Sequence, residues 1–332
     1  MNPPALSLNH LAEIFQPDSE TGFRYIPNAD SWHQRYEYNN PVHVNSRGWL
    51  GADFPDPAPA DITRIALLGD SFIAGLEAPP DKDVSTQLQK RLNDAALPTQ
   101  VLNYGLYGSN PTTQLIIFQK DILPRHPDIV IALYFDNDVS DVRRGMVYRD
   151  IYKHHVLIYE TVEQRDFVMH TLDRVLNAFW YRTVRASYLA RLAWVKLRPI
   201  FRSGLPVSPL TNLASTRLPI HRNRPEAERL IVAAYRQMAQ SCQQAGCQFA
   251  VFFLPDKEVL TGKVSPSYAE IQRQLERSGI PTIDLLPAVK AAGGVTLFYK
   301  FDGHFNAEGD AFLARQFQKL LDDRGWLPPA PK

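Results

Sequence analysis

The chain has 332 residues, enough for one large or two modest domains with a substantial core. Apolar residues make up 45% and charged residues 21%, which is ordinary for a folded protein. Lys and Arg number 36 against 35 Asp and Glu, and this balance argues against a chain that binds polyanions along its whole surface. Two cysteines are too few for a disulfide-stapled scaffold or a multi-cysteine metal site. We expect Cys242 and Cys247 to be buried free thiols rather than partners in a small closed loop.

No stretch approaches the roughly 18–20 unbroken apolar residues that a membrane-spanning helix needs. The opening segment lacks a basic start, a long apolar run and a small-residue cleavage site, so a signal peptide is not predicted. We therefore expect a cytoplasmic protein by default, and an extracytoplasmic one if the chain is truncated at its N-terminus. Leu11, Ile14 and Phe15 have the spacing of a short amphipathic helix.

Residues 1–60 are predicted to form an N-terminal extension that packs on the main domain. The segment 15–60 is rich in Pro, Asn, Asp and aromatic residues, which favours short strands between turns. Alternating runs at Arg35–Tyr38 and Val42–Asn45 are the expected strands. A proline-rich run that ends at Ala60 marks the boundary.

Residues 61–325 alternate between short apolar runs and helical patterns. Buried strands are expected at 64–68, 99–103, 128–134, 248–254 and 281–285. Helices are expected at 83–96, 111–123, 226–245, 266–278 and 307–324. This alternation predicts an α/β domain with a parallel sheet that is covered by helices on both sides.

The alternation is interrupted by an insertion at residues 142–225. Tyr148–Tyr159 and Thr161–Met169 are expected to form a hairpin, followed by a helical stretch at 170–200 and a loop near 203–225. The stretch 174–224 contains ten Lys or Arg residues, interleaved aromatic residues and no acidic residue. The preferred interpretation is a surface helix pair whose arginines meet acids from elsewhere in the fold, and peripheral contact with an anionic membrane or an acidic polymer is the alternative. No nucleic-acid module accompanies this charge, so a nucleic-acid partner is not predicted.

The tripeptide Gly69-Asp70-Ser71 stands directly after the first buried strand. A serine there lies at the carboxyl edge of the sheet, where open α/β folds place their ligands. If a helix begins near Ser71, free backbone N–H groups favour negative charge close to its hydroxyl. Serine is also a common helix cap, so the tripeptide alone leaves a catalytic and a capping role open.

A glycine and an amide follow the next two predicted strands. Gly108 lies in a turn after strand 99–103, where the missing side chain lets a backbone amide approach a ligand. Asn137 follows strand 128–134 at the same edge of the sheet. A purely structural turn and a polar loop are the alternatives. The glycine spacing does not match G-x-G-x-x-G, so dinucleotide binding is not predicted.

Near the C-terminus, Asp302 and His304 stand just before the last predicted helix. His304 is the candidate base for Ser71, because a serine hydroxyl is a poor nucleophile until an imidazole takes its proton. Asp302 is spaced to orient the other imidazole nitrogen. The Gly108 N–H and the Asn137 amide are candidate donors to a developing oxyanion. Together these residues predict an acyl-transfer site.

In these blocks the sequence resembles the SGNH, or GDSL-like, hydrolase superfamily. The matching blocks are Gly69-Asp70-Ser71, Gly108, Asn137-Asp138 and the pair Asp302 and His304. The resemblance covers about 61–140 and 226–325, and it implies a three-layer α/β/α flavodoxin-like fold with serine-dependent hydrolysis or transfer of acyl groups. It also implies that Ser71 is the nucleophile, His304 the base and Asp302 its orienter. The oxyanion hole would consist of the N–H groups of Ser71 and Gly108 and the Asn137 side chain.

Two positions depart from the usual pattern of the superfamily. Many members carry Asp-x-x-His, whereas here Phe301 stands three residues before His304 and the acid stands two before. This Asp-x-His spacing is similar to that of the branch containing alginate O-acetyltransferases and other polysaccharide O-acetylation proteins. The usual G-x-N-D block has Phe135 where its glycine would be, two residues before Asn137.

The sequence therefore predicts a serine esterase that acts on small acyl esters, with acetyl groups on carbohydrate as the expected substrate. An O-acetyltransferase that modifies a polysaccharide is the first alternative. A non-catalytic carbohydrate-binding protein that uses the same cleft is an alternative of another class. No metal or organic cofactor is expected, because the chain has no H-E-x-x-H and its other histidines lack metal-ligand spacing.

Overall fold

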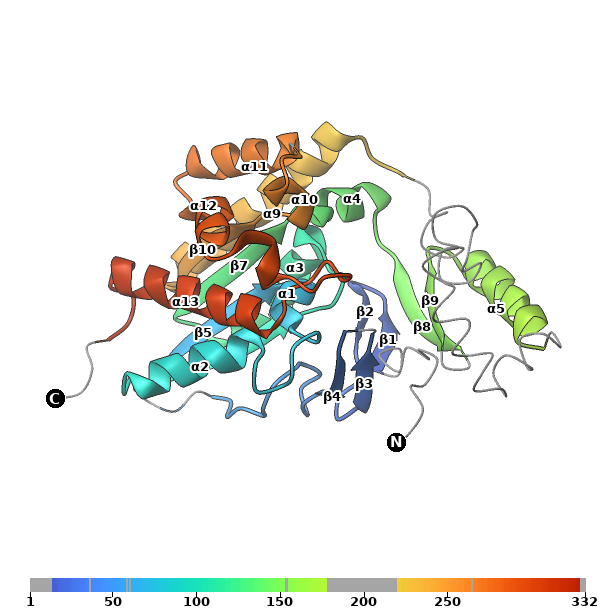
Figure 1. Ribbon diagram of the computed structural model, residues 1–332, viewed down its shortest axis with the longest axis horizontal. Helices are drawn as coiled ribbons and strands as arrows, with labels where there is room; N and C mark the ends of the chain where they lie inside the picture. Colours follow the sequence, from blue (N-terminus) through green and yellow to red (C-terminus); the bar gives the residue numbers. More distant parts are fainter. Residues whose placement is uncertain are drawn as a thin grey trace.

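The computed structural model describes residues 14–35, 37–57, 59, 61–152, 155–177, 220–263 and 265–328. Its centre is a five-stranded, wholly parallel sheet with the strand order β11-β10-β7-β5-β6 (Figure 1). The strands are β5 (Thr63–Gly69), β6 (Thr99–Gly105), β7 (Ile129–Phe135), β10 (Gln248–Leu254) and β11 (Thr282–Asp284). Counted along the chain, this order is the 2-1-3-4-5 arrangement of flavodoxin-like folds. The predicted three-layer α/β class is confirmed.

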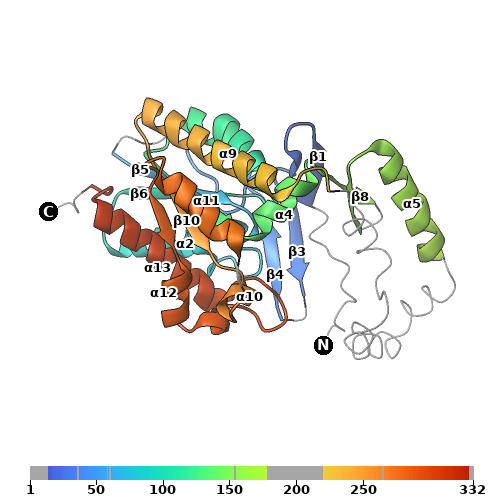
Figure 2. The same ribbon diagram turned by 90° about the horizontal axis from the view of Figure 1, so that it is seen from above.

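Helices cover both faces of the sheet, because successive side chains of a strand point to opposite sides. Ala66 and Leu68 of β5 belong to one buried cluster, and Ile65 and Leu67 belong to the other. The first face is covered by α3 (Pro111–Ile117), α9 (Arg224–Ala245) and α11 (Pro266–Glu276). The second face is covered by α2 (Val84–Asp94), α12 (Leu286–Ala291) and α13 (Ala307–Arg324). Figure 2 shows α9 and α11 on one side and α2, α12 and α13 on the other.

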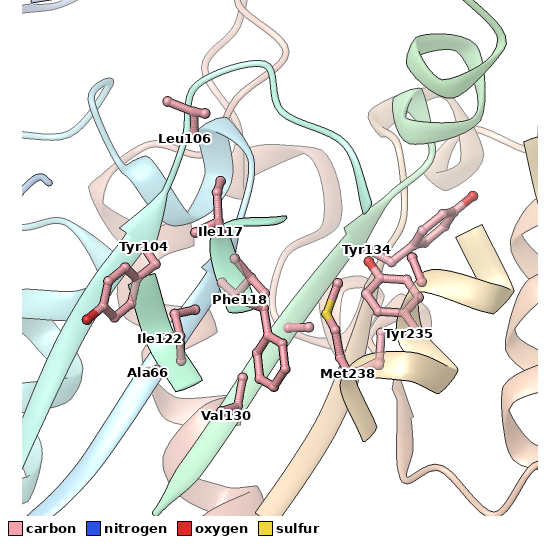
Figure 3. Close-up of a cluster of buried hydrophobic side chains, with 14 of the residues drawn as sticks. Ala66, Tyr104, Leu106, Ile117, Phe118, Ile122, Val130, Tyr134, Tyr235 and Met238 are labelled. Atoms are coloured by element: carbon pink, nitrogen blue, oxygen red, sulfur yellow. The ribbon is translucent and has the colours of Figure 1, made fainter. Parts of the chain in front are cut away.

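The first cluster is dominated by large side chains from α9, the sheet and the segment after α3. Figure 3 shows Tyr235 and Met238 of α9 beside Tyr134 of β7, with Phe118 over the middle of the sheet. These four side chains are fully buried. Burying one such side chain stabilises the fold by roughly 1.5–3 kcal/mol relative to leaving it exposed. This layer therefore anchors the strands whose ends carry the candidate site.

The predicted helix at 111–123 changes type part-way along. After α3 the chain forms a π-helical turn, η2 (Phe118–Ile122), and a 3₁₀ turn, η3 (Leu123–Arg125). Pro124 has no N–H to continue the α-helical ladder, which accounts for the end of the helix here. The predicted helices at 226–245 and 307–324 correspond to α9 and α13.

The N-terminal segment forms two antiparallel hairpins. Strand β1 (Phe15–Asp18) pairs with β2 (Gly22–Tyr25), and β3 (Asp30–Gln34) pairs with β4 (Asn39–His43). The predicted strand at Arg35–Tyr38 is wrong, because Arg35, Glu37 and Tyr38 lie between the end of β3 and the start of β4. Phe15 belongs to a strand rather than a helix because it pairs with Tyr25. Ile14 is buried directly before this strand, and Leu11 lies outside the described residues.

Helix α4 (Asn137–Arg144) leads into the insertion, which continues as a hairpin and a helix. The strands of the hairpin are β8 (Tyr148–Tyr152) and β9 (His155–Tyr159), and the helix is α5 (Val162–Asn177). The prediction that Thr161–Met169 forms a strand is wrong, because Val168 and Met169 pack from a helix against Tyr159. Figure 1 shows β8 running past the β1–β2 hairpin. Most of the basic stretch 174–224 lies outside the described residues.

The expectation of free thiols at Cys242 and Cys247 is wrong, because a disulfide joins them. Helix α9 ends in a Schellman motif at Gly246, where the Cys247 N–H donates to the Cys242 carbonyl at 2.9 Å. This motif brings the residue after the glycine against the last helical turn. The two Cα atoms are consequently 4.7 Å apart.

No helix in the described part of the chain is both long enough and apolar enough to span a bilayer.

Candidate active site

Three of the predicted site residues follow three neighbouring strands at one edge of the sheet. Ser71 begins the short helix α1 (Ser71–Ala74) after β5, the strand that lies between β6 and β7. Gly108 lies in the loop after β6, and Asn137 is the first residue of α4 after β7. The chain leaves β5 towards β6 and leaves the neighbouring β7 in the opposite direction towards β10, so this edge is the point where doubly wound folds bind their ligands.

Ser71, His304 and Asp302 form one continuous hydrogen-bonded chain. The Ser71 Oγ lies 2.9 Å from the His304 Nε2, and the His304 Nδ1 lies 2.5 Å from the Asp302 Oδ1. The serine is 233 positions away from the histidine in sequence, so only the tertiary fold brings them together. This arrangement can move a proton from the serine hydroxyl to the imidazole, with the carboxylate fixing the tautomer.

The loop that carries the histidine is held in shape by bonds at its base and its tip. At the base, Phe298 and Phe305 form an antiparallel bridge ahead of α13. At the tip, the carboxylate of Glu37 accepts the backbone N–H groups of residues 300, 301 and 302 at 2.7–2.9 Å. Tyr38 Oη donates to the Asp302 Oδ2 at 3.1 Å. The segment between β3 and β4 therefore holds the acid of the triad in place.

The protonation of His304 depends on the carboxylates that surround its ring. Burial alone would lower the pKa of His304, but Glu77, Asp302 and Asp70 together raise it to about 9. Burial would also raise the pKa of Asp302, but hydrogen bonds from His304 and Tyr38 hold this pKa well below its ordinary value. The pair is therefore an imidazolium–carboxylate pair at neutral pH.

Gly108 lies where a side chain would not fit. Its φ is +79°, and a Cβ at this position would lie 2.0 Å from a guanidinium nitrogen of Arg149. The Arg149 guanidinium is stacked 4.1 Å from the centre of the Phe23 ring. The loop is tied to the serine strand because the Leu106 N–H donates to the Gly69 carbonyl at 3.0 Å. The backbone after β6 is therefore fixed close to the start of α1.

The three groups predicted as donors to an oxyanion lie after neighbouring strands of the sheet. Within the described residues, the backbone N–H groups of Ser71 and Gly108 make no hydrogen bond to a protein acceptor. The Asn137 side chain is half-buried, and among those residues its Oδ1 has no hydrogen-bond partner. Phe135, which replaces the glycine of the usual block, packs its ring 4.5 Å from that of Phe72. The Phe135 ring thus packs against Phe72, the residue after Ser71.

Two buried aspartates lie beneath these donors and hold the loops. The Asp70 Oδ1 accepts the Phe72 N–H at 3.1 Å, and the Asp138 Oδ2 accepts the Phe135 N–H at 3.1 Å. The second oxygen of each carboxylate is buried with no hydrogen-bond partner in the described part of the chain. Burial raises the pKa of both groups, and the charge of Asp70 raises the pKa of Asp138 further.

Replacing Asp70 with asparagine should stabilise the fold increasingly as the pH rises. Burial raises the pKa of Asp70 from 3.8 to about 7, so the stability given by its protonated form is complete below pH 3.8 and is lost as the pH rises through 7. Asparagine retains an acceptor for the Phe72 N–H and has no proton to lose. In chemical denaturation, the free energy of unfolding of Asp70→Asn relative to the wild type should grow by on the order of 3 kcal/mol between pH 4 and pH 8.

Asp81→Asn is the matched control for this prediction, because the Asp81 side chain is 74% exposed. Its free energy of unfolding should follow the wild-type pH dependence. A constant difference between Asp70→Asn and the wild type at all pH values would show that the pKa of Asp70 is the same in the folded and unfolded states, which would contradict the prediction.

A separate hollow of about 670 Å³ lies between the β3–β4 hairpin and the start of α2. Trp32, His43 and Thr86 are among its lining residues, and none of the triad residues lines it. Its lining also includes an exposed histidine–carboxylate pair, in which the His43 Nδ1 lies 2.7 Å from the Asp30 Oδ1.

Sequence reasoning missed three residues that contact the triad or the loop that carries it. Glu37 and Tyr38 support the loop, and Glu77 places a second carboxylate oxygen 3.5 Å from the His304 Nδ1. Glu77 had a detectable signal, because it is the only charged residue in 72–80 and follows the serine motif closely. Glu37 and Tyr38 had none, because they were assigned to a strand.

Comparison with known proteins gives a likeness to solved structures only. No family model matches the chain, and no curated protein matches it. Among solved structures, a lipase/acylhydrolase from Enterococcus faecalis is 17% identical, with a TM-score of 0.44 over 81% of this chain and 99% of the other.

Two further solved structures give similar values. An acetyl xylan esterase is 12% identical, with a TM-score of 0.44 over 78% of this chain and 99% of the other. A psychrotrophic esterase from Pseudoalteromonas is 10% identical, with a TM-score of 0.43 over 79% of this chain and 98% of the other. Overlap of this extent is partial, so the function proposed below rests on the geometry of the side chains.

Proposed function

We propose that the chain is a serine esterase of the SGNH type that hydrolyses small acyl esters through an acyl-Ser71 intermediate. The observation that carries this proposal is the hydrogen-bonded chain from the Ser71 Oγ through the His304 ring to Asp302. A serine with a base on its hydroxyl and an acid behind that base is the arrangement that activates serine for attack on an ester carbonyl.

The first half of the reaction forms the acyl-enzyme. The Ser71 Oγ attacks the ester carbonyl while the neutral His304 takes the hydroxyl proton on Nε2. The oxyanion accepts hydrogen bonds from the N–H groups of Ser71 and Gly108 and from the Asn137 amide. When the tetrahedral intermediate collapses, the C–O bond to the alcohol breaks, and the imidazolium returns its proton to the departing oxygen.

The second half of the reaction removes the acyl group. A water molecule enters, His304 takes its proton, and the resulting hydroxide attacks the acyl carbonyl. Breaking the bond to Ser71 returns the proton to the serine oxygen and releases a carboxylic acid. A sugar hydroxyl in the place of water would give acyl transfer by the same steps.

The proposed substrate is an acetyl or similarly short acyl ester, with carbohydrate as the alcohol. The rings of Phe72 and Tyr107 lie 5.3 and 5.9 Å from the His304 ring, so aromatic side chains border the reacting atoms closely. Such walls suit a short acyl group. The carbohydrate part of the proposal rests on the Asp-x-His resemblance.

The test is product analysis with p-nitrophenyl acetate, with and without an acceptor oligosaccharide. The proposal predicts release of p-nitrophenol and one equivalent of acetate, with no dependence on the acceptor. Acetylated oligosaccharide as the main product would replace hydrolysis with O-acetyl transfer. Oligosaccharide binding without any turnover would overturn the enzymatic proposal in favour of a carbohydrate-binding protein.

A further inference from the structure

A second carboxylate lies behind the histidine of the candidate triad. Glu77 follows α1 in the chain, and its Oε1 lies 3.5 Å from the His304 Nδ1. Asp302 approaches the same nitrogen at 2.5 Å, so two acids face one side of the ring. Glu77 is 2% exposed, and its Oε1 accepts no hydrogen bond from the described residues.

The position of Glu77 is fixed by two other segments of the chain. Its backbone carbonyl accepts hydrogen bonds from the Asn40 Nδ2 at 2.6 Å and from the Tyr299 Oη at 2.8 Å. Asn40 belongs to β4, and Tyr299 belongs to the loop that carries His304. The same loop therefore holds both the imidazole and the backbone of the acid beside it.

A buried carboxylate is costly unless a positive charge or hydrogen bonds compensate it. The only cation within 4 Å of Glu77 among the described residues is an imidazole, either that of His304 or that of His33, whose Nδ1 is 3.8 Å away. Burial, together with the charges of Arg35 and His304, lowers the pKa of His33 to about 3, so His33 stays neutral. Burial raises the pKa of Glu77, and the charges of His304 and Arg35 act against this, with His304 the larger of the two and the one in direct contact.

Other titratable and charged groups face this pair from the neighbouring elements: Asp302, Asp70, Arg35, Tyr38 and Tyr107. Burial raises the pKa of Tyr38 and Tyr107, so both phenols are neutral. Asp70 acts on His304 through its charge only, because it makes no hydrogen bond to the ring. Glu77 and Asp302 are thus the two acids in direct contact with Nδ1.

We propose that Glu77 is a positioning residue which, together with Asp302, stabilises the imidazolium form of His304 and so sets the pH at which Ser71 is activated. This inference rests on the proposed esterase function. Only the neutral imidazole can accept the serine proton, whereas the imidazolium that follows is favoured by the buried acid. Glu77 thus favours the transition state while restricting the active form of the free enzyme to alkaline pH.

The test is the pH dependence of kcat/KM for p-nitrophenyl acetate in the wild type and in Glu77→Gln. In the wild type, kcat/KM should rise with pH up to about 9, because the pKa of His304 is raised to about 9 by Glu77, Asp302 and Asp70 against the lowering effect of burial. The acid limb of this profile is the range in which kcat/KM rises with pH, and in Glu77→Gln it should move to lower pH by about one unit or more. The plateau value of kcat/KM at high pH should fall by about tenfold.

Two further variants separate the charge of Glu77 from its packing. Glu77→Asp retains a carboxylate farther from the ring, so its acid limb should lie between those of the wild type and Glu77→Gln. Glu308→Gln removes an exposed carboxylate four residues after the histidine and should leave the limb unchanged. Titration of Ser71 with a fluorophosphonate in each variant confirms that equal amounts of folded enzyme are compared.

An acid limb in Glu77→Gln that coincides with that of the wild type would overturn the inference and leave Glu77 a packing residue. If Glu77→Gln does not fold, Glu77→Asp decides, since a limb displaced downwards supports the inference and an unmoved one overturns it. Failure of the proposed function looks different, because Ser71→Ala would then retain turnover. If Ser71→Ala is inactive while the acid limb of Glu77→Gln coincides with that of the wild type, the proposed function stands and only the inference about Glu77 is overturned.

Discussion

Replacing Ser71 with alanine should lower kcat/KM for p-nitrophenyl acetate by about 10⁴- to 10⁶-fold, because no other group can take over formation of the acyl-enzyme. Replacing His304 with alanine should give a loss of similar size, since the hydroxyl then has no base at 2.9 Å. The double variant should be no worse than either single one, because residues that act as a unit show non-additive losses.

The measurement is initial-rate kinetics above pH 8 on protein whose folding is checked by thermal unfolding. Ser109→Ala is the matched control, because this buried hydroxyl lies near the site but donates to the Gly69 carbonyl rather than to the imidazole. Retention of more than a tenth of the wild-type kcat/KM in Ser71→Ala, or simple additivity in the double variant, would contradict the roles proposed for the two residues.

Replacing Asp302 with asparagine should lower kcat/KM by about 10³- to 10⁴-fold while leaving the fold in place. An amide that donates a hydrogen bond to the His304 Nδ1 favours the wrong tautomer, which places a proton on Nε2 where the base must be free. The lost negative charge also lowers the pKa of His304, so the acid limb of kcat/KM should move to lower pH.

Tyr38→Phe is the comparison for this prediction. It removes the hydroxyl that donates to the Asp302 Oδ2 but keeps the carboxylate, so its loss should be about tenfold or less. Equal losses in Tyr38→Phe and Asp302→Asn would indicate that the loop position, rather than the charge of Asp302, is what the reaction needs.

The sheet could be predicted because its three central strands, β5, β7 and β10, are buried on both faces. Runs such as 129–134 and 249–254 are continuously apolar, and helical spacing separates them, so parallel order follows from the pattern. The N-terminal hairpins and the start of the insertion could not be predicted as well. Arg35–Tyr38 alternates like a strand but lies between β3 and β4, because the Tyr38 hydroxyl and the Glu37 carboxylate bond to the loop at 300–302. Those contacts link residues more than 260 positions apart.

In the candidate site, too, residues placed by the local sequence pattern could be predicted, whereas residues placed by contacts between distant segments could not. Ser71, Gly108 and Asn137 could be placed together because the ends of parallel strands share one edge. The meeting of Ser71 with His304 was inferred from the order of the motifs, and the side chains are in hydrogen-bond contact. Glu77 was missed because it becomes a partner of His304 only after two other segments clamp its backbone.

Covalent labelling with a fluorophosphonate, followed by mass spectrometry of the digested protein, addresses the central claim most directly. An activated serine at the sheet edge should give a single stoichiometric adduct on the peptide that contains Ser71, with labelling faster at pH 9 than at pH 6. Ser71→Ala should remain unlabelled under the same conditions. An adduct on a different residue, or equal labelling of the wild type and Ser71→Ala, would contradict the proposed nucleophile.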